Sequence, residues 1–129
     1  MNKRMYWLGV GALALFGCSD DDHHSEPVTP SGAVCAAGST LTYESFGKTF
    51  MQTYCTSCHS SALSGTSRSG APSDHDFDTV GGIRSALEHI DSNAAAGPLG
   101  TNTAMPPGNL KPSLDERKRL GEWLACGAP

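Results

Sequence analysis

The segment Cys55-Thr56-Ser57-Cys58-His59 places two thiols and an imidazole in a fixed order within one short stretch of chain. CxxCH is the attachment sequence of covalently bound haem, because each thiol can form a thioether with a vinyl group at the porphyrin edge. The imidazole of the next residue then lies under the iron and can supply the proximal ligand. The motif therefore predicts one covalent haem c, attached through Cys55 and Cys58 and ligated by His59.

Two other kinds of site also use closely spaced cysteines. A thioredoxin-like dithiol belongs beside a strand-helix-strand unit, and no stretch of this sequence has the pattern of a convincing strand. A zinc site needs two further thiolate or imidazole ligands in a matched pair, and the sequence has no second CxxC and no HxxxH. Haem attachment is the interpretation that uses all three residues of the motif.

Around this motif the chain resembles the small monohaem class I c-type cytochromes, from about Cys35 to the C-terminus. The resemblance rests on an aromatic segment that runs into the motif, a Pro-rich loop and a terminal segment: TYESFGKTFMQTY, TNTAMPPGN and SLDERKRLGEWLACG. It implies an all-α fold of three or four helices around the haem, with the first and last helices crossing. It also implies that a loop methionine, here Met105, closes the other face of the iron.

The aromatic segment before the motif has the period of a helix. Thr42 is a suitable N-cap, and aromatic residues then recur at helical spacing, at Tyr43, Phe46, Phe50 and Tyr54. We expect this stripe to belong to the core. Gly47 costs the helix about 1 kcal/mol relative to Ala, and the resemblance implies that the last helix approaches closely there.

Residues 59–76 have no usable period and predict a loop over one haem face. The resemblance implies that the carbonyl of Pro72 accepts the second N–H of the proximal imidazole, which fixes the ring. His75 and His89 are the rival iron ligands. A helix over residues 79–90, capped by Asp78, turns His89 toward the surface, because its inward face is Val80, Ile83, Leu87 and Ile90.

Met105 is the candidate sixth ligand. The other methionines lie in the N-terminal segment or on the helix that enters the motif, at Met1, Met5 and Met51. Met105 lies 46 residues beyond His59, far enough for the chain to reach the other haem face. Pro106 and Pro107 restrict the backbone and give a stiff loop that can present a side chain. The alternative is an ordinary methionine in a surface loop.

The last segment has the signals of a helix start and stop. Ser113 and Glu116 form a capping box, and Gly127 marks the end. Its apolar face consists of Leu114, Leu120, Trp123 and Leu124. We expect the basic run Arg117-Lys118-Arg119 to be a solvated face, with a haem propionate or a partner protein as its further possible contacts.

Residues 1–17 have the pattern of an export signal. Lys3 and Arg4 form a basic start, and the apolar stretch 6–16 is shorter than the roughly 20 residues of a membrane span. The tetrapeptide LFGC resembles a bacterial lipobox, so we expect its Cys18 to be acylated and to become the mature N-terminus. The alternative is cleavage after ALA at 12–14, which would release a soluble periplasmic protein.

Acyl chains on Cys18 would anchor the protein to a membrane surface that faces the periplasm, and Ser19 after it favours the outer membrane. Residues 18–32 are polar, acidic and interrupted by prolines, so they predict a flexible tether ahead of a haem domain at 33–129. His23 and His24 lie in this tether and are assigned no ligand role.

Two cysteines remain, Cys35 before the first helix and Cys126 at the end of the last. They form an even pair in an exported domain whose other thiols are used by haem and lipid. The two ends meet if the terminal helices cross. We therefore expect a disulfide between Cys35 and Cys126.

The charge of the chain bears on its partners. Without Lys3 and Arg4, which leave with the signal, seven of the nine Lys and Arg residues remain against thirteen Asp and Glu, a formal charge of −6. This balance argues against nucleic acid and favours redox partners with basic docking surfaces.

These observations predict a one-electron carrier of the bacterial periplasm with His59/Met105 ligation, rather than an enzyme. One CxxCH attaches one haem, which excludes a multihaem wire and a dihaem peroxidase. Two alternatives stay open. One is a haem sensor or haem enzyme with an open sixth position, and the other is a haem subunit of a larger oxidoreductase.

Overall fold

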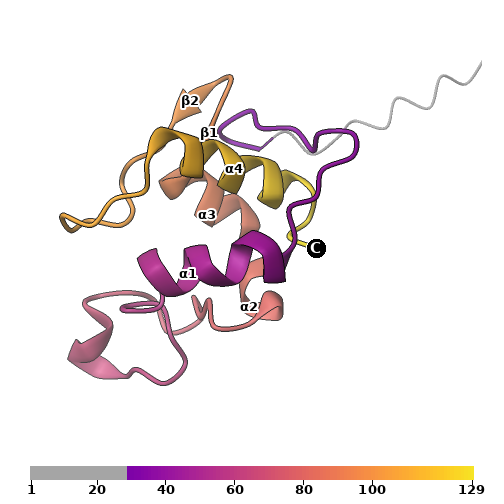
Figure 1. Ribbon diagram of the computed structural model, residues 1–129. Helices are drawn as coiled ribbons and strands as arrows, with labels where there is room; N and C mark the ends of the chain where they lie inside the picture. The colour runs from indigo at the N-terminus through magenta and orange to yellow at the C-terminus, as the bar shows by residue number, and fades with distance from the viewer. Residues whose placement is uncertain (1–28) are drawn as a thin grey trace, which may run out of the picture.

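The computed structural model describes residues 29–129. The predicted signal, Cys18 and the tether up to residue 28 lie outside the described residues. Within 29–129 the chain is mainly helical with one small sheet (Figure 1). None of the helices in this part is long and apolar enough to cross a membrane.

The elements follow in the order η1 (Tyr43–Gly47, π-helical), α1 (Lys48–Tyr54), η2 (Gly65–Arg68, 3-10), α2 (Val80–Arg84), α3 (Leu87–Ala94), β1 (Ala96–Gly97), β2 (Gly100–Thr101) and α4 (Leu114–Ala125). β1 and β2 pair antiparallel, with Ala96 opposite Thr101. The expectation of an all-α chain misses this hairpin, because strands of two residues have no alternating pattern that the sequence can reveal.

The first helix forms as predicted, although its first turn is π-helical. The hydroxyl of Thr42 accepts the Ser45 amide at 3.1 Å and caps η1, which continues directly into α1. Phe46 and Phe50 are buried, and the Tyr43 and Tyr54 side chains pack at the edge of the same cluster. The aromatic stripe is therefore core.

The first helix contacts α4 near its middle, at Gly47, and at its C-terminal end. A Cβ on Gly47 would overlap the ring of Trp123, which is fully buried and lies edge-on to Phe46 with centroids 6.0 Å apart. At the C-terminal end of α1 the Tyr54 hydroxyl donates to Glu116 at 3.0 Å. Because Gly47 precedes Tyr54 while Trp123 follows Glu116, the two helices meet running in opposite directions (Figure 1). Gly47 provides the close approach.

The predicted start and end of α4 are confirmed. Ser113 caps the helix, with Glu116 completing the capping box, and Gly127 follows its end in left-handed geometry at φ +80°. The predicted faces need two corrections. Leu114 is 52% exposed and lies outside the core, whereas Arg117, expected in solvent, is only 3% exposed.

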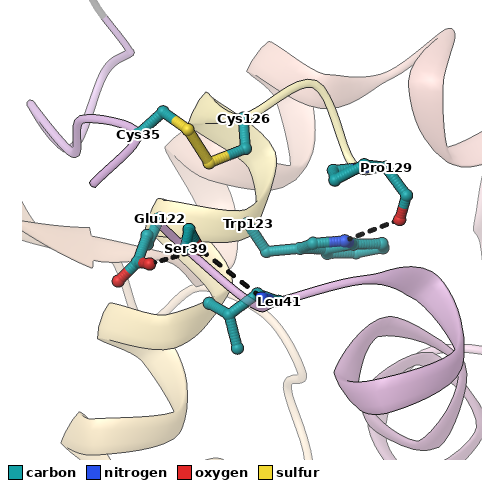
Figure 2. The surroundings of a disulfide bond; sticks show 7 residues. All are labelled: Cys35, Ser39, Leu41, Glu122, Trp123, Cys126 and Pro129. Atoms are coloured by element: carbon teal, nitrogen blue, oxygen red, sulfur yellow. Dashed lines mark hydrogen bonds between the residues drawn. A yellow bond between two sulfur atoms is a disulfide. The ribbon is translucent and has the colours of Figure 1, made fainter. Parts of the chain in front are cut away.

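A disulfide joins Cys35 to Cys126, with their Cα atoms 4.7 Å apart (Figure 2). Two hydrogen bonds flank it: Ser39 donates to Glu122 at 2.6 Å, and the Trp123 indole donates to the Pro129 carbonyl at 3.4 Å. The bridge spans a sequence separation of 91 residues. In the chain-entropy model, closing so long a loop stabilises the fold by roughly 4–5 kcal/mol.

The predicted single helix over residues 79–90 is wrong. The chain forms α2 and α3 with a break at Ala86, whose φ of −130° is not helical. The N-cap is Thr79 and not Asp78, because the Asp78 carboxylate accepts the Ser61 amide at 2.6 Å instead. Two adjacent glycines in α2, at 81 and 82, lower its helix propensity and favour a short first segment.

The folded domain begins earlier than predicted. Ser31 is fully buried, its amide donates to one oxygen of Asp91 at 2.6 Å and its hydroxyl to the other at 2.8 Å. Residues 29–32, expected to belong to the tether, are therefore part of the domain. The sequence did not reveal this contact, because an aspartate in a helix is usually solvent-exposed and its partner Ser31 is distant in the sequence.

Candidate haem site

The four residues predicted to hold the haem line one cavity. It has a volume of about 430 Å³, and Cys55, Cys58, His59 and Met105 are all in its wall. The loop after the motif and the loop around Met105 form much of the rest and both lie at the end of α1 (Figure 1). The volume is within the range of about 300–1,000 Å³ that is usual for ligand and cofactor pockets.

The two motif thiols are free and partly buried. Cys55 is the C-cap of α1, and its carbonyl accepts the amides of Cys58 at 3.1 Å and His59 at 2.9 Å, so the motif forms a tight turn. Burial raises the pKa of the Cys55 thiol to about 12. Because the thiolate is the reactive form, this environment argues against a redox dithiol that works at neutral pH.

The His59 ring is held on two sides. Its Nδ1 lies 3.1 Å from the His75 carbonyl, and its ring stacks on Phe77 with centroids 4.6 Å apart and planes 15° apart. A carbonyl only accepts hydrogen bonds, so Nδ1 carries the proton. Desolvation lowers the pKa of His59, which favours the neutral ring. The Nε2 lone pair is therefore available to a metal ion.

The acceptor predicted for this N–H is wrong. The carbonyl of Pro72 accepts a hydrogen bond from Arg68 Nη2 at 2.5 Å, and the carbonyl of His75 takes its place beside His59. The resemblance indicated the correct loop but not the correct residue. The conformation of residues 59–76 depends on individual contacts, which the sequence does not reveal because this segment has no periodic pattern.

Arg68 organises this loop. The residue is 6% exposed. Its guanidinium donates to the carbonyls of Ser60 at 2.7 Å and His75 at 3.2 Å and to the Asp76 carboxylate at 2.8 Å. The His75 carbonyl thus accepts from both Arg68 and the predicted proximal ligand. Sequence reasoning missed Arg68, since a lone arginine among Ser and Gly residues is usually solvated.

Met105 is 38% exposed and lines the main cavity. Together with His59 it also borders a second, smaller void beneath α3. Its backbone is fixed by two hydrogen bonds: its amide donates to the Asn93 carbonyl at 2.9 Å, and its carbonyl accepts from Arg117 at 3.0 Å. The fold therefore brings the thioether of Met105 and the imidazole of His59 to the same cavity.

The rival histidines lie next to one another. The His89 ring is 4.4 Å from that of His75, and its side chain is exposed, as predicted. However, His89 also lines the main cavity, so it is not remote from the site. His75 Nδ1 is buried and meets no hydrogen-bond partner within residues 29–129. Of the two, His89 is the better placed alternative ligand.

The residues in the cavity fit a covalent haem by their chemistry. Two free thiols are available for thioethers, an Nε2 lone pair and a soft thioether are available for iron, and the cavity is large enough for a cofactor. Among residues 29–129, no three His, Cys, Asp or Glu side chains are grouped so as to hold a metal ion by themselves. The chain matches no protein-family model, no curated protein and no solved structure.

Proposed function

We propose that this protein is a one-electron carrier whose domain holds a single covalent haem c and has a class I cytochrome c-like fold. The observation that carries the proposal is the shared cavity of Cys55, Cys58, His59 and Met105. These residues are the complete set that such a haem needs, and the chain brings them together from two separate loops.

When bound, the haem supplies reversible exchange of one electron at its iron. Cys55 and Cys58 hold the porphyrin edge by thioethers. His59 presents Nε2, and its orientation is set by the His75 carbonyl and by stacking on Phe77. Met105 would present a soft sulfur from the Pro-rich loop.

A second function has one observation in its favour. Met105 is 38% exposed at the cavity wall, so the face of the cavity that it lines is accessible from solvent. If Met105 does not bind iron, the sixth position is open to a small ligand, as in a haem sensor or haem enzyme.

A haem subunit of a larger oxidoreductase would also carry one electron at a time, as in the first function, but would do so only when docked to its partner.

A redox titration of the purified full-length protein, followed by visible absorption, tests the carrier function. We expect one haem per chain, a reversible transition that follows a one-electron Nernst curve, and no carbon monoxide binding by the reduced protein within the mixing time. Rapid carbon monoxide binding would favour the open-site function. A protein without a redox-active chromophore would contradict both.

We further propose a lipid anchor at Cys18, which supports a position in the periplasm-facing cell envelope. The support is the LFGC tetrapeptide after a basic and apolar start. Mass spectrometry of the mature N-terminus should find an acylated Cys18, and Cys18→Ser should move the protein to the soluble fraction. An unmodified N-terminus at Leu15 would contradict the anchor and support the soluble alternative.

A further inference from the structure

Arg117 is a charged residue in the interior of α4. It is 3% exposed, and within residues 29–129 it forms no ion pair with a carboxylate. Burying a charge is unfavourable unless hydrogen bonds replace its lost hydration. The hydrogen-bond partners of Arg117 therefore indicate which part of the structure the buried side chain stabilises.

All the hydrogen bonds of the Arg117 side chain go to backbone carbonyls. Nη1 donates to Ala94 at 2.7 Å, to Asn102 at 2.8 Å and to Met105 at 3.0 Å. Ala94 ends α3, Asn102 follows β2, and Met105 belongs to the Pro-rich loop. One nitrogen on α4 thus binds the end of α3, the residue after the β1–β2 hairpin and the Pro-rich loop.

These bonds complete the fixation of the Met105 backbone. Its amide is already bound to the Asn93 carbonyl on α3, and Arg117 binds its carbonyl from α4. The preceding part of the loop is fixed as well, because the Asn102 side chain donates to the Asp91 carbonyl at 2.8 Å. Met105 is therefore held between two helices, with its side chain in the cavity wall.

We infer that Arg117 is a positioning residue that holds Met105 in place as the sixth iron ligand. The inference rests on the proposed function, in which Met105 binds iron. A thioether is a weak donor, so its binding depends on a loop that is already held near the bound geometry. Neither Lys118 nor Arg119 can take over this role, because both are exposed and Arg119 lies over the Phe46 ring instead.

The test uses the haem-loaded, full-length protein with Arg117→Met, Arg117→Lys and the matched control Lys118→Met. If Met105 binds iron, the oxidised wild type should show a weak near-infrared sulfur-to-iron charge-transfer band at neutral pH. In Arg117→Met we expect loss of this band, with carbon monoxide binding to the reduced protein at least tenfold faster. Amide hydrogen exchange at Met105 should also be at least tenfold faster. Arg117→Lys keeps the charge and should be intermediate, and Lys118→Met should match the wild type.

A purely structural role for Arg117 would lower the melting temperature without changing the band or the carbon monoxide rate. An Arg117→Met protein with wild-type band and wild-type exchange at Met105 would overturn the inference. If Arg117→Met does not fold, Arg117→Gln removes the charge with less change in polarity and should show the same losses. A wild type that lacks the band would instead overturn ligation by Met105, and exchange at Met105 then tests the positioning alone.

Discussion

Replacing both Cys55 and Cys58 with alanine should leave a chain that carries no covalently attached haem. The two thiols lie in one tight turn at the cavity wall, the position required for two thioethers to one porphyrin edge. After denaturation and extraction with acid-acetone, the pigment should stay on the wild-type chain. The double variant should release its haem or never acquire it, so the attached haem falls from one per chain to none.

Ser57→Ala is the matched control for this experiment. Ser57 lies between the two cysteines and is exposed, and its hydroxyl is 3.9 Å from the Cys58 sulfur. This variant should retain haem as the wild type does. Haem that can be extracted from the wild-type chain would contradict covalent attachment and with it the cytochrome interpretation.

Substitution of Met105 should change the midpoint potential of the haem. A thioether favours ferrous over ferric iron, whereas a second imidazole does not. Met105→His should therefore lower the potential by on the order of 100 mV, a fraction of the roughly 0.8 V that axial ligands span. Met105→Ala should open the iron to carbon monoxide and other external ligands. Spectroelectrochemical titration measures the first effect and stopped-flow mixing the second.

Leu110→Ala is the control for Met105, because Leu110 lines the same cavity from the same loop and has no donor atom. It should leave the potential nearly unchanged. An oxidised wild type without the near-infrared band at neutral pH, together with an unchanged potential in Met105→His, would contradict ligation by Met105. His89, in the same cavity wall, would then be the next residue to substitute.

The local features of the fold were predictable because each has a short-range cause. Thr42 and Ser113 could be recognised as N-caps, since capping depends on residues within one turn. The pairing of Cys35 with Cys126 followed from counting the thiols that remain if the chain is exported and the motif cysteines bind haem. Met105 and the motif residues line one cavity, and ligation of iron by Met105 stays a prediction.

The buried polar contacts could not be predicted in the same way. Charged side chains usually lie at the surface. Three of them are buried here because of contacts with segments distant in the sequence or irregular in structure: Arg68, Asp91 and Arg117. The acceptor beside His59 depends on such a contact, because Arg68 donates to the carbonyls of both Pro72 and His75 and fixes the part of the loop that places the His75 carbonyl beside the ring. The break at Ala86 has a local contribution instead, since Gly81 and Gly82 lower the helix propensity of the segment before it, although the apolar period continues through it.

The arginine that organises the loop after the motif also sets how many residues this loop can contain. Loops normally accept added residues at their tips, because their ends alone are fixed. Here Arg68 binds carbonyls at both ends of the segment, from Ser60 to His75. A residue gained or lost between them would break one of these bonds, and the His75 carbonyl would pass the displacement on to the His59 ring. The length of this loop is therefore part of the geometry of the site.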